Sequence, residues 1–225
     1  MVESKGWDWE SIKDNPEYAA HLRPTEFGYY YSNIWKDAGR ETVLDLGTGL
    51  GRHAICFAKA GLKVSAIDMS EYGIKHLQSW AENEKLEIDA KVGDMMSLPY
   101  ADKSFDCLFA CHVISHSDST GIKKIIKEIE RVLKPNGEVF LSFSSKETTD
   151  FIEAVRPKVD DNTMFWEDSD GPDIDGSPLF YADLSDIIEL MSNFDNLFVR
   201  HTEYCSLDVN NKRKTKYYYV SATLK

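Results

Sequence analysis

The stretch Val43–Ala54, which reads VLDLGTGLGRHA, decides the fold of this 225-residue chain. It begins with a short apolar run, ends in a helical pattern, and carries glycines at positions 47, 49 and 51 between the two. Glycine accepts the dihedral angles of a tight strand-to-helix turn, and its missing side chain lets a ligand approach the backbone. The spacing is GxGxG rather than the GxGxxG of dinucleotide-binding turns. The stretch therefore predicts a strand, a ligand-binding turn and a helix in direct succession.

Short apolar runs alternate with helical patterns after this turn, which indicates βαβ units and a doubly wound α/β fold with a parallel sheet. Strands are expected at 42–46, 63–67, 88–92, 105–111 and 138–143. The clearest helix has one apolar face, made of Ile122, Ile125, Ile126, Ile129, Val132 and Leu133. A later helix carries Leu184, Ile187, Ile188 and Met191 on one face, and strands at about 197–201 and 217–224 close the chain.

The order of these segments predicts a single domain over residues 1–225. Residues 1–40 would form an N-terminal helical cap and residues 41–145 the cofactor-binding core. Residues 146–180 would form a lid or insertion loop. Residues 181–225 would add the closing helix and the strand hairpin.

Composition narrows the partners that the chain could bind. The formal net charge is −12, which disfavours nucleic acid and anionic membrane surfaces, so a small-molecule substrate is expected. No run approaches the ~18 apolar residues of a membrane span, and no leader pattern opens the chain, so we expect a cytoplasmic protein. The four cysteines form no CxxC pair, so neither a disulfide framework nor a metal site is expected. A monomer and a homodimer both remain open.

Three acidic residues have the pattern of a nucleoside-binding site. Asp45, at the end of the first strand, would repel a pyrophosphate but suits an ammonium group. Asp68 ends the second strand, where a carboxylate can accept both hydroxyls of a ribose. In the segment VGDMMSLPY, residues 92–100, Asp94 would bind an adenine amino group while Met95 packs on the ring.

These segments, together with RVLKPNGEVFLSF, resemble the class I S-adenosylmethionine-dependent methyltransferases from about Val43 to Phe143. Within that family the small-molecule branch, which includes the ubiquinone/menaquinone biosynthesis methyltransferases, is the most similar. The resemblance implies a Rossmann-like sheet of seven strands with the last strand antiparallel, S-adenosyl-L-methionine as cofactor, and methyl transfer to a small molecule. The family usually has a second glycine where Asn136 stands, and the turn survives this change. The expected cofactor-binding residues are Asp45, Gly47, Thr48, Gly49, Gly51, Arg52, Asp68, Met69, Asp94, Met95 and Cys111.

Several residues keep both a functional and a structural interpretation. His112 and His116 follow the fourth strand, where one could act as a general base, although methyl transfer often needs none. Phe165 and Trp166, in the acidic segment 160–175, would form either a lid over a cationic substrate or part of a surface loop. Tyr30, within the run 29–31, would either close over the cofactor or pack the cap.

Two other functions remain open at this point. A non-catalytic sensor or partner subunit could keep the same cofactor pocket without turnover. An NAD-dependent oxidoreductase is disfavoured by the glycine spacing and by Asp45.

Overall fold

The structure is a computed structural model that describes residues 6–11, 13, 16–154, 156–166, 176–205 and 214–225. Seven strands form its central sheet in the order β3-β2-β1-β4-β5-β10-β9. Their bounds are β1 Thr42–Leu46, β2 Lys63–Asp68, β3 Ile88–Val92, β4 Phe105–Ala110, β5 Leu133–Ser145, β9 Phe194–Cys205 and β10 Lys214–Leu224. Strands β1 to β5 are parallel, whereas β10 runs antiparallel to both β5 and β9. The expected sheet of seven strands with an antiparallel last strand is confirmed.

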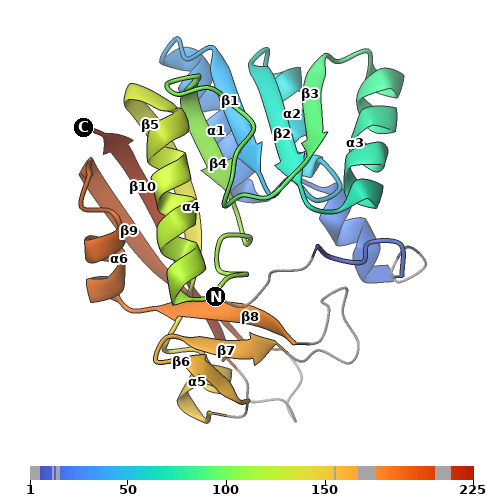
Figure 1. Ribbon diagram of the computed structural model, residues 1–225. Helices are drawn as coiled ribbons and strands as arrows, with labels where there is room; N and C mark the ends of the chain where they lie inside the picture. Colours follow the sequence, from blue (N-terminus) through green and yellow to red (C-terminus); the bar gives the residue numbers. More distant parts are fainter. Residues whose placement is uncertain (1–5, 12, 14–15, 155, 167–175, 206–213) are drawn as a thin grey trace.

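Helices cover both faces of this sheet (Figure 1). Their bounds are α1 Glu26–Asp37, α2 Arg52–Lys59, α3 Glu71–Glu84, α4 Ser119–Val132, α5 Thr149–Ile152 and α6 Leu184–Leu190, and a 3-10 helix, η1, spans Pro16–Leu22. Alternate side chains of a strand point to opposite faces. In β1, Val43 therefore joins the apolar cluster of α1 and α2, while Leu44 joins the cluster of α4 on the other face. The predicted apolar face of α4 is buried throughout.

Residues 158–182 differ from the acidic loop expected over 160–175. They form three strands, β6 Lys158–Asp160, β7 Thr163–Trp166 and β8 Ser177–Ala182, which pair as an antiparallel branch. Strand β8 joins the end of β5 through two parallel pairs, so the branch lies at the carboxyl edge of the sheet. The three strands are too short for an alternation of apolar and polar residues to be recognised in the sequence, so the prediction gave a loop instead. Residues 167–175 lie outside the described residues.

Two further expectations need correction. In α6 only part of the predicted face is buried, because Leu184 and Ile188 are 48% and 55% exposed while Leu190 takes a buried place. The fifth strand begins at Leu133 rather than Glu138, with Asn136 at a φ of 61° inside it. Within the described part of the chain, no helix is both long and apolar enough to cross a membrane.

Candidate functional site

A cavity of about 340 Å³ lies at the carboxyl ends of β1, β2 and β4. Its walls come from the glycine turn, the end of β2, the turn after β3, the loop after β4, one residue of β10 and the N-terminal segment. Ligands of open α/β sheets bind in such a crevice. The expected cofactor residues on its wall are Gly47, Thr48, Gly49, Arg52, Asp68, Met69, Met95 and Cys111.

The three glycines of the turn all have positive φ angles, but they have different neighbours. A Cβ atom on Gly47 would lie 2.1 Å from Val113 Cγ2, and one on Gly49 would lie 2.9 Å from Trp9 Cζ2. Both positions face the cavity wall. Gly51 instead packs against α3, where a Cβ atom would lie 2.4 Å from Leu77 Cδ1. Gly51 is not on the cavity wall, so its glycine is required by helix packing.

Asp45 lies behind the wall rather than on it. Its side chain is 1% exposed, and its Oδ2 accepts a hydrogen bond of 2.6 Å from the hydroxyl of Thr48. Burial raises the pKa of Asp45 to about 7, although the hydrogen bond from Thr48 and the charge of Arg52 oppose that rise. The carboxylate therefore reaches the cavity only through Thr48, which lines it.

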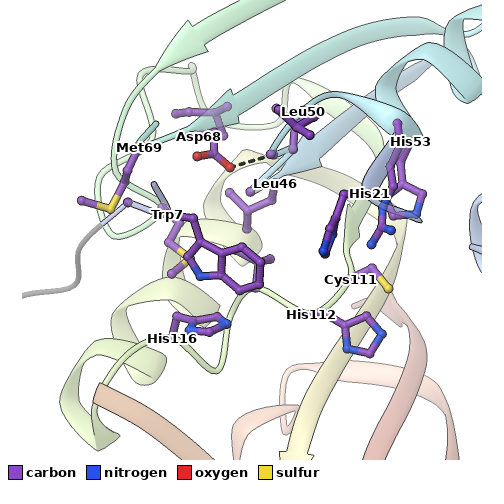
Figure 2. A pocket seen from close by; sticks show the side chains of 18 of the residues that line it. Trp7, His21, Leu46, Leu50, His53, Asp68, Met69, Cys111, His112 and His116 are labelled. Carbon is purple, nitrogen blue, oxygen red and sulfur yellow. Dashed lines mark hydrogen bonds between the residues drawn. The ribbon is translucent and has the colours of Figure 1, made fainter. Parts of the chain in front are cut away.

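Asp68 lies on the wall and fixes the glycine turn. Its Oδ2 accepts from the amide of Gly49 at 2.8 Å (Figure 2), and its Oδ1 accepts from the amide of Ser70 at 2.8 Å. Burial raises the pKa of Asp68, although these two hydrogen bonds act to lower it. A carboxylate has about four acceptor sites, so both oxygens keep capacity for ligand hydroxyls.

The third expected segment contributes its apolar part to the cavity. Met95, which is 7% exposed, and Gly93 line the wall. Asp94 does not line it, because its Oδ1 turns back to accept from the amide of Met96 at 2.8 Å. The structure thus brings Met95, which was expected to pack on the adenine, to the cavity, whereas Asp94, the expected partner of the adenine amino group, does not line it.

Arg52 and Cys111 reach the cavity from α2 and from the end of β4. Burial lowers the pKa of Arg52, and its Nη1 donates to the carbonyl of Ala20 at 3.3 Å. Burial raises the pKa of the Cys111 thiol to about 12, so this sulfur stays protonated and unreactive at neutral pH.

Both histidines after β4 line the cavity, and burial lowers the pKa of each to about 4. His112 has a φ of 57°, a region that side-chain-bearing residues rarely occupy, and its Nε2 lies 3.3 Å from the hydroxyl of Tyr219. The ring of His116 instead meets the ring of Trp7 edge to face, with centroids 5.5 Å apart (Figure 2). Both rings are therefore neutral at pH 7.

The loop that carries these histidines is held by its neighbours. The amide of His112 donates to Ser142 Oγ at 2.6 Å, and Ser115 Oγ accepts from the amide of Ser144 at 2.9 Å. Phe180 of β8 donates its amide to the carbonyl of Ser115 at 2.7 Å. Strands β5 and β8 thus fix the loop beside the cavity.

The N-terminal segment supplies wall residues that sequence reasoning missed. Trp7, Trp9 and His21 line the cavity and pack on one another, with centroids 5.0 Å apart for the pairs that include Trp9. The aromatic-rich start of the chain was the available signal. His53, which follows Arg52 at the start of α2 and forms a cationic pair with it in the sequence, also lines the cavity, as does Tyr217 of β10, which no sequence pattern indicated.

The expected lid residues lie elsewhere. Tyr30 is 58% exposed on α1 and absent from the wall, whereas its neighbour Tyr31 packs on Trp35 in the core. Phe165, in β7, pairs with Pro178 and does not reach the cavity. Trp166 ends β7, and its side chain lies outside the described part of the structure.

Comparison with known proteins agrees with this geometry. Residues 43–137 match a family model described as a methyltransferase domain. The chain is 30% identical over 145 residues to norajmaline N-methyltransferase of Rauvolfia serpentina, covering 62% of this chain and 49% of that protein. It is 28% identical over 155 residues to a ubiquinone biosynthesis O-methyltransferase of Xanthomonas oryzae, covering 68% and 61%. The chain thus spans about half to three fifths of these relatives.

Solved structures share the fold. An S-adenosylmethionine-dependent methyltransferase of Methanosarcina mazei superposes with a TM-score of 0.68 at 19% identity, covering 82% of this chain and 93% of that one. The N1-methyltransferase of 1,6-didemethyltoxoflavin from Burkholderia thailandensis, solved with S-adenosylhomocysteine, gives 0.64 at 17% identity, covering 97% and 84%. The glycine turn and Asp68 lie on one cavity, residues 43–137 match the methyltransferase-domain model, and the chain shares the Rossmann-like fold of these solved methyltransferases.

Proposed function

We propose that this chain transfers a methyl group from S-adenosylmethionine to a small-molecule acceptor. One observation carries the proposal: the glycine turn and the carboxylate of Asp68 lie on the wall of one cavity, at the carboxyl edge of the sheet. The residues fit a nucleoside with an amino-acid tail. The turn lacks the Cβ atoms that would narrow the cavity, Met95 offers an apolar face, and Asp68 offers hydroxyl acceptors.

When bound, the cofactor supplies an electrophilic methyl group, and the chain supplies position and a site that excludes water. Asp68 and Met69 would hold the ribose, and Met95 would pack on the adenine. Arg52 suits the carboxylate of the amino-acid tail, because it places a buried cation on the wall. Since Thr48 covers Asp45, we assign Asp45 to position the turn rather than to touch the ligand.

For the acceptor's proton we assign His112 rather than His116. Both rings line the cavity and have a lowered pKa, and His112 has a hydrogen-bonded route toward solvent. The Nε2 of His112 meets the hydroxyl of Tyr219, which meets the hydroxyl of Tyr204 at 2.9 Å. Tyr204 is 44% exposed, so this chain of groups leads from the cavity to solvent. The acceptor would therefore be an O–H or N–H group, whose proton needs a route out.

The charge of the protein supports a small acceptor over a polynucleotide. A net charge of −12 repels phosphate backbones, and the cavity of about 340 Å³ suits a small ligand. The matched relatives are named for methyl transfer to norajmaline and in ubiquinone biosynthesis, which are small-molecule reactions. Cys56, Cys107 and Cys111 are free thiols, which suits the reducing cytoplasm.

Calorimetric titration with S-adenosylmethionine, S-adenosylhomocysteine and NAD tests the cofactor. We expect the first two to bind and NAD to bind weakly or not at all. Asp68→Ala should lose the binding, whereas Asp89→Ala, which removes an exposed carboxylate of β3, should keep it. Preference for NAD would overturn the proposal.

Turnover separates the enzyme from a non-catalytic sensor. Protein, S-adenosylmethionine and a pool of phenols and secondary amines should yield S-adenosylhomocysteine and a methylated product by mass spectrometry. Binding of the cofactor without product from any acceptor pool would favour the sensor.

A further inference from the structure

We infer that the indole N–H of Trp9 donates a hydrogen bond to an oxygen of the bound cofactor, so that the N-terminal segment is part of the cofactor site. The inference rests on the proposed function, because it takes the cavity ligand to be S-adenosylmethionine or its product. Three independent features of Trp9 carry it.

The first feature is the position of the ring. Trp9 lines the cavity, and its Cζ2 lies 2.9 Å from the place that a Cβ atom of Gly49 would occupy. The indole therefore lies directly on the glycine turn. The amide of Gly49 in turn donates to Asp68, the carboxylate assigned to the ribose, which lines the same cavity as Trp9.

The second feature is a buried donor with no acceptor. Trp9 is 7% exposed, and no residue that the structure describes accepts a hydrogen bond from its Nε1. The indoles of Trp35 and Trp80 show the usual arrangement, since they donate to Glu138 at 3.1 Å and to Glu84 at 3.4 Å. Buried N–H groups are nearly always paired, and leaving one unpaired destabilises the protein. A ligand oxygen in the cavity would complete the pairing of Trp9.

The third feature is the anchoring of the segment on both sides of the cavity. At one end the space beside Gly6 is closed by the backbone of Met69 and Ser70, each 3.2 Å from a Cβ atom built there. At the other end the ring of Trp7 lies over His116, as Figure 2 shows. Gly6 and Trp7 thus tie the segment to the end of β2 and to the histidine loop, and two residues later the ring of Trp9 packs on the glycine turn and on His21.

The acceptor in the cofactor is an oxygen of either the ribose or the amino-acid carboxylate. Both parts would lie near Asp68 and the glycine turn. 5′-Methylthioadenosine has the ribose but lacks the amino-acid tail, so it distinguishes the two possible acceptors of the hydrogen bond. S-Adenosylhomocysteine carries both.

Trp9→Phe tests the inference, because it keeps an apolar ring and removes the N–H. Calorimetry should show that S-adenosylhomocysteine binds about 5- to 30-fold more weakly, the usual effect of losing one ligand hydrogen bond. Trp80→Phe, a change of the same kind on α3 away from the cavity, should bind like the wild type. Unchanged far-UV circular dichroism would show that Trp9→Phe remains folded.

The outcomes separate this inference from the proposed function. If the wild type binds neither S-adenosylmethionine nor S-adenosylhomocysteine, the proposed function fails. If the wild type binds and folded Trp9→Phe binds equally well, the inference alone is wrong. Loss of affinity for both S-adenosylhomocysteine and 5′-methylthioadenosine assigns the bond to the ribose, and loss for the former alone assigns it to the carboxylate. Should Trp9→Phe not fold, Trp9→His, which keeps a ring N–H, must bind S-adenosylhomocysteine more tightly than Trp9→Ala.

Discussion

The Nε2 atom of His112 lies 3.3 Å from the hydroxyl oxygen of Tyr219, at the boundary between the cavity and the antiparallel end of the sheet. Tyr219 is 3% exposed, and its hydroxyl meets the hydroxyl of Tyr204, which is 44% exposed. In the proposed reaction the bound cofactor would supply the methyl group, and His112 would take the proton of the acceptor. Tyr219 and Tyr204 can then pass a proton to water, each giving one as it takes one.

Removing the base should slow methyl transfer to protic acceptors. A positioned general base contributes about 10²- to 10⁴-fold, so His112→Gln should lower kcat within that range. Tyr219→Phe should lower it less, by about tenfold, because the ring of His112 stays in place. Calorimetry should show that both variants still bind S-adenosylhomocysteine. A kcat unchanged in His112→Gln would remove the base from the mechanism.

The pH dependence of the reaction should report the buried state of His112. Burial lowers its pKa to about 4, so the ring is neutral and able to accept a proton throughout pH 5 to 8. The rate with a phenol acceptor should therefore show no inflection near 6.5, the ordinary histidine value, and should fall only toward pH 4. An inflection near 6.5 that disappears in His112→Gln would show that the ring is solvated during turnover.

Asp45 should make the cofactor-free protein less stable as the pH rises. Its folded pKa of about 7 lies above the unfolded value, so the stability that it contributes is present below about pH 4 and is lost as the pH rises to about 7. Asp45→Asn does not titrate. The free energy of unfolding of Asp45→Asn should therefore exceed that of the wild type, and the difference should grow between about pH 4 and pH 7. It should reach a few kcal/mol, since each pKa unit corresponds to about 1.4 kcal/mol.

Asp106 is a control for this measurement, because its pKa is shifted in the opposite direction to that of Asp45. Hydrogen bonds from Lys134 and Thr42 outweigh burial and hold its pKa below the ordinary value. Its contribution to stability is therefore present above the unfolded pKa and lost as the pH falls through the folded one. Asp106→Asn should be less stable than the wild type at pH 7. Urea unfolding from pH 2 to 8 measures both variants, because Asp106 titrates below about pH 4. Equal pH slopes for Asp45→Asn and the wild type between pH 4 and 7 would contradict the raised pKa of Asp45.

The central sheet could be predicted from sequence because its strands bury alternate residues on two helix-covered faces. Val43 and Leu44 are both apolar yet join different clusters, and such continuous apolar runs are typical of parallel strands. The branch at 158–182 could not be predicted, because its strands are short. Most of the expected cofactor residues lie on one cavity, whereas Asp94 and Gly51 do not line it and make internal contacts.

The residues that were missed come from distant parts of the chain. Tyr204 lies opposite Thr215 in the β9–β10 pair, and its long side chain reaches along the strands to the hydroxyl of Tyr219. A single sequence does not reveal that register. Trp9 reaches Gly49 through the path of the N-terminal segment, which follows no helical or strand period.

Gly51→Ala should destabilise the protein through Leu77. A left-handed backbone costs a residue with a side chain about 1–2 kcal/mol, and Gly39→Ala isolates this cost, because Gly39 has a φ of 73° and no atom within 4 Å of its added Cβ. Gly51→Ala adds a contact of 2.4 Å with Leu77 Cδ1, and such overpacking costs about 1–3 kcal/mol more. The double variant Gly51→Ala/Leu77→Ala should therefore lose less free energy of unfolding than the two single changes together, since the cavity left by Leu77 receives the new methyl group. Additive losses in denaturant unfolding would show that backbone strain alone, and not the packing of α2 against α3, requires glycine at position 51.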